Sequence, residues 1–187
     1  MNDIKIEDNY LKSHELKHVQ DLFGPSELGN RIQNEIGIIP WNLGEILNYP
    51  TGDVNELDNY QLSSILYQSP DSIIGPDPHT THFNKFLFPL FFRGMDPRCL
   101  LKVKVNLQMR TTEIRKNGFH CDYPPHFSGA KTSIFYINNN DGYTEFKDGT
   151  KIESVANRLI TFPQDMEHRG TTCTNKPFRL VINFNYF

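Results

Sequence analysis

The hydrophobic pattern of the chain changes near residue 100. Before that point, the clearest pattern is helical, and it predicts a helix over about 14–23 with Ser13 as its N-cap and Gly24-Pro25 as its end. A second helix is predicted from Ser26 to near Gly37. A third is predicted over about 79–93, interrupted or kinked near Pro89. The intervening stretch, 38–80, mixes short apolar pieces such as 60–67 with turn-rich segments.

Beyond residue 100, apolar and polar residues alternate as they do in β-strands. The clearest segment is 100–109, LLKVKVNLQM, and further strands are predicted over 118–123, 131–138, 143–147, 151–162 and 178–187. Several short strands separated by turns are typical of a sandwich or a double-sheet jelly roll. We therefore expect one mainly β domain over 1–187. Its helical and mixed support region would cover about 1–99, and its jelly-roll core about 100–187.

Composition and charge make nucleic-acid binding and membrane insertion less favoured functions for this chain. A chain of 187 residues is long enough for a substantial core. A formal charge of −3 does not indicate a cationic phosphate-binding surface, so nucleic acid is the less favoured partner. The densest apolar run, Phe86–Phe92, is far short of the ~20 residues of a membrane helix. With a polar N-terminus and three scattered cysteines, Cys99, Cys121 and Cys173, we expect free thiols and a cytoplasmic location.

The sequence His120-Cys121-Asp122 is the first sign of chemistry. If it lies on a strand, His120 and Asp122 share a face and Cys121 points away. They then supply two ligands of the 2-His-1-carboxylate triad that binds non-haem iron. The motif alone is weak, because an exposed histidine before a turn-forming aspartate looks the same. His168, which lies 46 residues after Asp122 and past another predicted strand, is a candidate for the third ligand.

The last predicted strand carries an unusual polar row. Its residues divide into an apolar face (Leu180, Ile182, Phe184, Tyr186) and a mixed face (Arg179, Val181, Asn183, Asn185). The mixed face has two interpretations. It is either the solvent side of an edge strand or the wall of a polar cavity inside a barrel, where Arg179 binds a carboxylate.

Taken together, these motifs resemble the 2-oxoglutarate- and Fe(II)-dependent dioxygenases, and within them the prolyl-4-hydroxylase-like branch. The order is HxD, a second histidine about 50 residues later, and an arginine about ten residues after that. Segments 132–138 (TSIFYIN), 141–146 (DGYTEF) and 158–163 (RLITFP) are similar to segments of that branch. The resemblance covers about 100–187 and has the general look of short phage-encoded members. It implies a double-stranded β-helix (jelly-roll) core flanked by α-helices.

The resemblance also implies roles for individual residues. His120, Asp122 and His168 would hold Fe(II), Arg179 and Tyr136 would bind the distal carboxylate of 2-oxoglutarate, and Asn183 would line the cosubstrate pocket. The implied reaction uses molecular oxygen and converts 2-oxoglutarate to succinate. It hydroxylates an unidentified substrate, with a prolyl residue of a peptide or protein, or a small molecule, favoured.

Three departures from the branch concern the cosubstrate contacts rather than the triad. Val181 stands where many relatives have serine, and no tyrosine lies about ten residues before His120. The paired glycine of the branch is Asp141-Gly142 here.

Two alternatives remain open at this stage. A cupin-like metal-binding β-barrel would keep the three metal ligands but would have no use for Arg179 or Tyr136. A non-enzymatic viral β module would not bring His120, Asp122 and His168 together. The sequence indicates no membrane partner and leaves the oligomeric state open.

Overall fold

The structure, a computed structural model, describes residues 4–23, 41–45, 60–69, 87–122 and 129–187. Two helices and ten strands lie in these ranges. In chain order they are β1 (Lys5–Glu7), α1 (Ser13–Phe23), β2 (Asn42–Glu45), β3 (Tyr60–Gln68), α3 (Phe88–Met95), β4 (Leu100–Met109), β5 (Lys131–Tyr136), β6 (Tyr143–Phe146), β7 (Lys151–Glu153), β8 (Arg158–Pro163), β9 (His168–Gly170) and β10 (Phe178–Tyr186).

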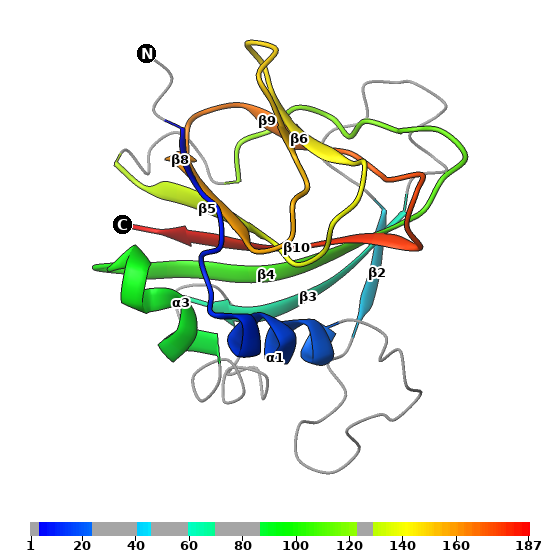
Figure 1. Ribbon diagram of the computed structural model, residues 1–187. Helices are drawn as coiled ribbons and strands as arrows, with labels where there is room; N and C mark the ends of the chain where they lie inside the picture. The colour runs from blue at the N-terminus through cyan, green and yellow to red at the C-terminus, as the bar shows by residue number, and fades with distance from the viewer. Residues whose placement is uncertain (1–3, 24–40, 46–59, 70–86, 123–128) are drawn as a thin grey trace.

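The strands form two antiparallel sheets. The larger sheet has the order β1-β8-β5-β10-β4-β3-β2, and the smaller has the order β7-β6-β9. Figure 1 shows the small sheet above the large one, with α1 and α3 below. From β5 onward the chain passes back and forth between the sheets, with β5, β8 and β10 in the large sheet and β6, β7 and β9 in the small one, which gives the predicted jelly-roll core.

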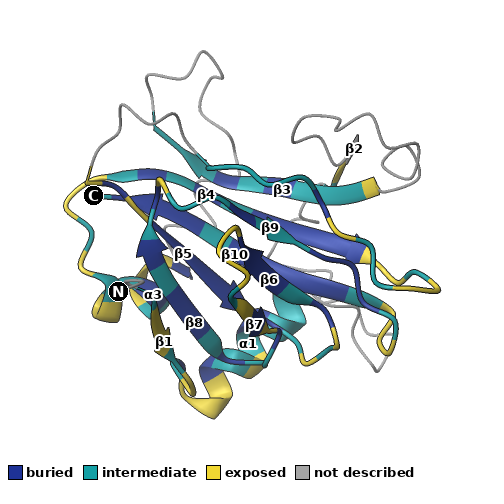
Figure 2. Cartoon of the chain, turned by 90° about the horizontal axis from the view of Figure 1, so that it is seen from above, coloured by how far each residue is buried: buried dark blue, intermediate teal, exposed yellow. Residues whose placement is uncertain are grey.

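One face of the large sheet packs against the helices. Val19 and Phe23 of α1 and Phe91 of α3 belong to one buried cluster with the apolar rows of β4 and β10. Figure 2 shows the central strands mostly in the buried colour, with the exposed positions mainly at turns. The apolar residues of α1 recur at helical spacing and therefore lie on one face of the helix. That face, from which the helix was predicted, is the one that packs against the sheet.

Strict alternation gives the central strands β4 and β10 a second, polar face. On β4, Val103, Val105 and Leu107 join the helix-side core, whereas the residues between them line a cavity between the sheets. On β10, Leu180, Ile182 and Phe184 do the same, and Arg179, Val181, Asn183 and Asn185 face the cavity. The two strands pair in register from Phe178 to Asn185 of β10, so their polar rows form one continuous wall.

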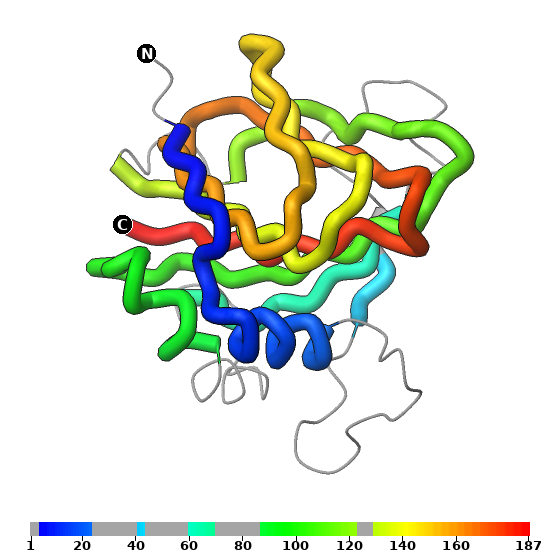
Figure 3. The backbone as a smooth tube through the Cα atoms, in the orientation of Figure 1, coloured from blue at the N-terminus to red at the C-terminus, as the bar shows by residue number. Residues whose placement is uncertain are grey.

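Asn157 fixes the N-terminal segment to the core. Its side chain bonds both backbone groups of Leu11, which donates to Oδ1 at 2.8 Å and accepts from Nδ2 at 2.8 Å. Asn157 itself has a φ of 66°, a conformation that asparagine tolerates better than most residues. Figure 3 shows the N-terminal segment running beside the chain around 158–163, where β1 pairs with β8.

The helix predictions agree with the structure where it describes them. The helix predicted over 14–23 is α1, although Ser13 is its first residue rather than its N-cap, and Glu15 accepts the Lys12 N–H at 2.9 Å. The helix predicted over 26–37 lies outside the described ranges. Of the helix predicted over 79–93, the described part is α3, and Pro89 stands in its first turn, where a missing N–H breaks no helical bond.

Most strand predictions are confirmed, and two are corrected. Of the segment 118–123, the described part, 118–122, is not a strand and has one isolated bridge, at His120. The segment 151–162 is two strands, because the chain leaves the small sheet after β7 and turns at Asn157 before β8 joins the large one. The helical and mixed region over about 1–99 also supplies β1, β2 and β3 to the large sheet.

The remaining structural expectations concern cysteines and membranes. Cys99, Cys121 and Cys173 are free thiols, as predicted. Neither α1 nor α3, the helices of the described ranges, has the length and apolar character needed to cross a bilayer.

Phe91 provides a test of the helix-side core. It is fully buried and its ring lies 4.9 Å from that of Phe135 and 4.8 Å from that of Phe184, whereas Phe88 on the same helix is 42% exposed. We expect Phe91→Ala to lower the free energy of unfolding by about 3–5 kcal/mol, because it leaves a cavity in packed surroundings. Phe88→Ala should cost about 1 kcal/mol or less. Urea denaturation of both variants measures this, and equal losses would contradict the described packing.

Candidate metal centre

The candidate centre begins with a pair of backbone hydrogen bonds. His120 N–H donates to the His168 carbonyl at 3.0 Å, and His168 N–H donates to the His120 carbonyl at 3.0 Å. In such an antiparallel pair the Cα atoms are about 5.5 Å apart and the side chains lie on the same side. The two imidazole rings are accordingly 4.8 Å apart, although their residues are far apart in the sequence.

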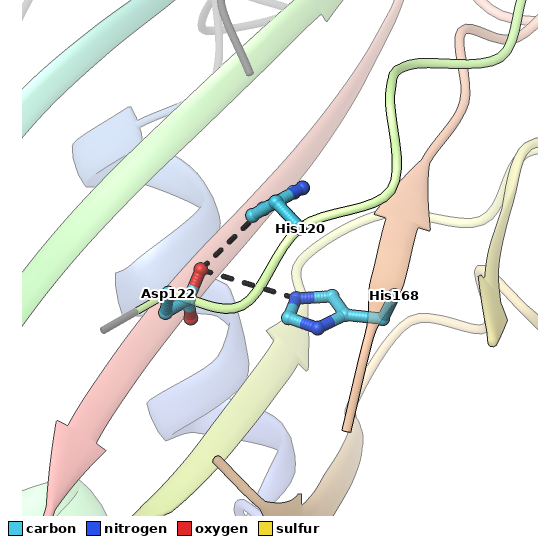
Figure 4. A group of neighbouring side chains, drawn as sticks. All are labelled: His120, Asp122 and His168. Carbon is cyan, nitrogen blue, oxygen red and sulfur yellow. Dashed lines mark ion pairs between the residues drawn. The ribbon is translucent and has the colours of Figure 1, made fainter. Parts of the chain in front are cut away.

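Each imidazole is oriented by a carbonyl two residues before it. His120 Nδ1 lies 3.1 Å from the Gly118 oxygen, and His168 Nδ1 lies 3.1 Å from the Met166 oxygen. A carbonyl only accepts, so Nδ1 of each ring carries a proton, and in the neutral imidazole Nε2 is the nitrogen that keeps a lone pair for a metal. Both Nε2 atoms face Asp122 Oδ1, at 3.5 Å from His120 and 3.9 Å from His168 (Figure 4).

Asp122 is held in place from the opposite side. Asn185 of β10 donates from Nδ2 to Asp122 Oδ2 at 2.8 Å, and the same Nδ2 donates to Thr132 Oγ1 of β5 at 3.0 Å. Two strands of the large sheet therefore position the carboxylate, which leaves Oδ1 directed at the two imidazoles. Supporting hydrogen bonds of this kind orient metal ligands and tune their affinity.

The ionisation states favour metal binding. Burial opposes the charge of Asp122, but its hydrogen bond to His120 and the nearby imidazoles hold its pKa well below the usual value. Burial lowers the pKa of His168, and the charge of Asp122 only partly opposes this. Burial alone would lower the pKa of His120, but the hydrogen bond to Asp122, the charge of Asp122 and the Gly118 carbonyl together outweigh burial and raise it. The site thus combines one carboxylate with two imidazoles whose Nε2 protons a bound metal ion would displace.

The geometry of the three ligand atoms suits one ion. They all lie within 4.8 Å of one another. Two atoms on one face of an ion, each bound at about 2.1 Å, lie about 3 Å apart, so the ligand atoms would move inward to complete the site. Two nitrogens and one oxygen on one side of an ion leave its other positions open towards the cavity. The three residues therefore converge as predicted, and the non-enzymatic alternative, which required that they do not, loses its support.

The centre opens into a cavity of about 310 Å³ between the sheets. Its lining includes the three candidate ligands, the polar rows of β4 and β10, and Thr144 and Gly170 of the small sheet. The polar row of β10 therefore faces a cavity, which decides between the two interpretations of that strand.

Arg179 is a buried cation in this cavity. It is 4% exposed, and its guanidinium donates to Ser154 Oγ at 2.8 Å, Thr144 Oγ1 at 3.1 Å and Gln108 Oε1 at 3.3 Å. All three partners are neutral, and Arg179 forms no ion pair with a carboxylate in the part of the chain that the structure describes. Burial lowers its pKa, but an arginine stays protonated.

Glycine makes room for the buried arginine. A Cβ at Gly142 would lie 2.8 Å from Arg179 Cδ and 2.6 Å from the Thr172 carbonyl oxygen, so no larger residue fits there. In the segment 141–146, the prolyl-4-hydroxylase-like branch has two adjacent glycines, and this chain has Asp141 and Gly142 in their place. Gly142 is thus the glycine of the pair that is kept.

The other two predicted cosubstrate residues lie in different places. Tyr136 is fully buried behind Thr144, to which its hydroxyl donates at 2.8 Å, and its ring lies 5.6 Å from the Arg179 guanidinium. The described cavity lining does not include it. Asn183 lines the cavity, and its Oδ1 is buried without a hydrogen-bond partner in the described structure. The cosubstrate roles of both residues stay predictions.

Sequence reasoning missed the second half of the cavity wall. The polar row of β4 comprises Lys102, Lys104, Asn106 and Gln108. Its signal was present in the alternation KVKVNLQ, which has the same form as the polar row of β10. Cys121 was predicted to point away from the site, but it lines the cavity, because the segment around it is not a pleated strand and alternation does not hold there.

Comparison with solved structures matches this architecture over nearly the whole chain. An oxidoreductase of the 2OG-Fe(II) oxygenase family from Burkholderia pseudomallei is similar with a TM-score of 0.64 and 11% identity, over 98% of this chain and 84% of that one. The fold is that of the 2-oxoglutarate/Fe(II) oxygenases. No protein-family model and no curated protein matches the sequence.

Two prolyl hydroxylases share this oxygenase fold. A Pseudomonas putida prolyl-4-hydroxylase has a TM-score of 0.54 and 11% identity, over all of this chain and 93% of that one. A Trichoplax adhaerens prolyl hydroxylase, solved with a hypoxia inducible factor peptide fragment, has a TM-score of 0.56 and 16% identity, over all of this chain and 84% of that one. The fold implied by the sequence resemblance is thus confirmed.

A buried ion cluster holds β9, which carries His168, against β6. Glu145 is 7% exposed and accepts from Arg169 Nε at 2.7 Å, with Lys116 at 3.3 Å and Lys151 at 3.8 Å. Glu145 and Arg169 are direct cross-strand partners, next to the pair of Phe146 and His168. The cluster therefore fixes the strand that positions His168.

Glu145→Gln tests this cluster through its pH dependence. Burial raises the pKa of Glu145, but Arg169 and Lys116 together lower it below its usual 4.5. A carboxyl with a lowered folded-state pKa stabilises the fold above its unfolded pKa, and this contribution disappears as the pH falls through the folded value. We expect Glu145→Gln to lower the free energy of unfolding by about 1–2 kcal/mol at pH 7. The deficit should shrink as the pH falls below about 4.5. A pH-independent deficit in urea titrations would contradict the ion-pair account.

Asn185→Ala tests the positioning of Asp122. We expect the affinity for Co(II), measured by calorimetry, to fall about 10–100-fold, because Asp122 loses the hydrogen bond that orients it. Asn175→Ala is the matched control, since it removes a hydrogen bond that the Asp141 N–H donates to Asn175 Oδ1 on the exposed surface. An unchanged Co(II) affinity in the Asn185 variant would show that Asn185 does not position the metal ligand.

Proposed function

We propose that the chain is an Fe(II)- and 2-oxoglutarate-dependent oxygenase that hydroxylates a C–H bond of its substrate. The observation that carries this proposal is the burial of Arg179 with only neutral partners in the cavity of the candidate triad. Removing a cation from water costs several kcal/mol unless an anion compensates it. A dicarboxylate between the metal and Arg179 provides that compensation.

The residues present fit the implied metal and cosubstrate. His120, Asp122 and His168 would hold Fe(II) through two imidazole Nε2 atoms and one carboxylate oxygen, a donor set suited to iron with open positions. Bound iron would supply the oxygen activation that couples decarboxylation of 2-oxoglutarate to succinate with hydroxylation of the substrate. Iron(II) and the two cosubstrates, 2-oxoglutarate and molecular oxygen, are thus the cofactors of the proposal.

The protein's own contribution is positioning and exclusion of water. The Arg179 guanidinium is a planar donor fork that suits a carboxylate, and Thr144 and Ser154 already hold it in a fixed direction. Ile134 and Val181 line the cavity beside these polar groups and belong to the apolar cluster between the sheets. Val181, which replaces a serine found in many relatives, thereby adds an apolar contact where they have a hydroxyl.

The buried arginine also supports the oxygenase over the cupin-like alternative. A metal-binding barrel without a dicarboxylate has no use for an uncompensated cation inside its cavity. A neutral side chain at position 179 would serve such a barrel better. The substrate class of the proposed reaction includes prolyl residues and small molecules, in keeping with the peptide-bound relative.

Arg179→Gln tests the proposal directly. We expect the dissociation constant for 2-oxoglutarate, measured anaerobically on the Fe(II) protein, to rise about 30-fold, which is about 2 kcal/mol for one charge-assisted contact. The metal affinity should change less than twofold. Succinate formation in air should fall in parallel.

Arg98→Gln is the matched control, since Arg98 is exposed and is not part of the cavity lining. Equal losses of metal and 2-oxoglutarate affinity in the Arg179 variant would assign Arg179 a structural role and contradict the proposal.

A further inference from the structure

Lys104 is a second cation in the cavity that the proposed reaction does not use. It stands on the cavity face of β4, directly across from Asn183 of β10, and is half-buried. Within the described part of the chain its side-chain ammonium group forms no hydrogen bond or ion pair. A lysine in the interior of a candidate active site without an acidic partner indicates a ligand with a negative charge.

The charges of the loaded site leave Lys104 uncompensated. A divalent metal and Arg179 together balance Asp122 and the two carboxylates of 2-oxoglutarate. Lys104 then remains as a positive charge beside a neutral set, and Lys102 adds a further one to the same wall. Burial and Lys102 both lower the pKa of Lys104, and only Asp122 opposes them. A bound carboxylate would remove this imbalance.

Asn183 adds a second requirement. Its Oδ1 is buried and has no hydrogen-bond partner in the described structure. An oxygen acceptor cannot bond to 2-oxoglutarate, which is a dianion without donors, so it calls for an N–H or O–H group. Lys104 and Asn183 are cross-strand neighbours, whose Cβ atoms lie about 5 Å apart. The matching ligand has a carboxylate and a donor group close together.

The rest of the wall indicates a small, polar ligand. Asn106 accepts from Gln61 Nε2 at 2.8 Å, so amide groups continue the wall beyond Lys104. The cavity of about 310 Å³ is at the small end of ligand sites, which span about 300–1,000 Å³. 2-Oxoglutarate would occupy part of that space, so the remainder suits a molecule of similar size.

We propose that the substrate of this site is a free amino acid whose α-carboxylate binds Lys104 and whose amino group donates to Asn183 Oδ1. This inference rests on the proposed function for the place of 2-oxoglutarate. It differs from action on a residue within a peptide, because such a residue has lost both its free carboxylate and its free amino group.

A binding screen on the whole protein tests the inference without turnover. The protein, loaded with Zn(II) and 2-oxoglutarate, is mixed with the twenty free L-amino acids, their α-carboxamides and capped tripeptides, and binding is followed by saturation-transfer NMR. At least one free amino acid should bind, with its carboxamide at least tenfold weaker and the capped peptides weaker still. Lys104→Gln should lower the affinity for that amino acid at least tenfold and should leave the affinity for 2-oxoglutarate within twofold of the original value.

Lys131→Gln is the matched control, since Lys131 is exposed at the start of β5, and it should change neither affinity. The inference is overturned if no free amino acid binds, or if the carboxamide or a capped peptide binds as tightly as the free amino acid. It is also overturned if Lys104→Gln lowers the affinity for 2-oxoglutarate and not the affinity for the amino acid. Binding of an amino acid without binding of 2-oxoglutarate would contradict the proposed function but uphold the role of Lys104. Binding of 2-oxoglutarate alone would contradict only this inference.

Discussion

Two reciprocal hydrogen bonds between the backbones of His120 and His168 fix the geometry on which the site depends. They join the segment before β5 to β9 and place both imidazoles on one side of the pair. Asp122 then needs only to be turned towards them, which Asn185 does from β10. The candidate centre thus depends on main-chain pairing that supports the side chains. A substitution that removes the ion pair between Glu145 and Arg169 of β9 would therefore change the position of His168 without touching the triad itself.

The two faces of the large sheet differ along β4 and β10, where the side towards the helices is apolar and the side towards the small sheet is mostly polar. One face packs against α1 and α3 and supplies most of the hydrophobic core. The other face carries Arg179, Lys102 and Lys104 together with several amides into the space beneath the small sheet. Burying Arg179 and Lys104 there lowers the free energy of unfolding unless anions compensate their charges. The destabilising groups of the fold thus lie at the site where ligands would bind. This division joins the two proposals, since each assigns an anion to one of the two cations.

The sequence predicted the parts of this arrangement that follow from strict patterns. Alternation located β4, β5 and β10, and the order of His120, Asp122, His168 and Arg179 indicated the triad and the buried arginine. It did not locate β3, whose segment YQLSSILYQ lacks alternation and contains a register shift, or β9, which has only three residues. The role of Lys104 was also missed. Its strand was recognised, but which of its faces meets the helices depends on packing that no local pattern contains.

If the triad and Arg179 bind one ligand between them, the bound metal and 2-oxoglutarate should give a shared optical signal. Visible absorption of the protein, followed under anaerobic conditions during addition of Fe(II) and then 2-oxoglutarate, tests this. We expect a weak charge-transfer band that appears only when both are present and saturates at one equivalent of each per chain. The absence of that band, together with the absence of any heat of 2-oxoglutarate binding by calorimetry, would contradict it.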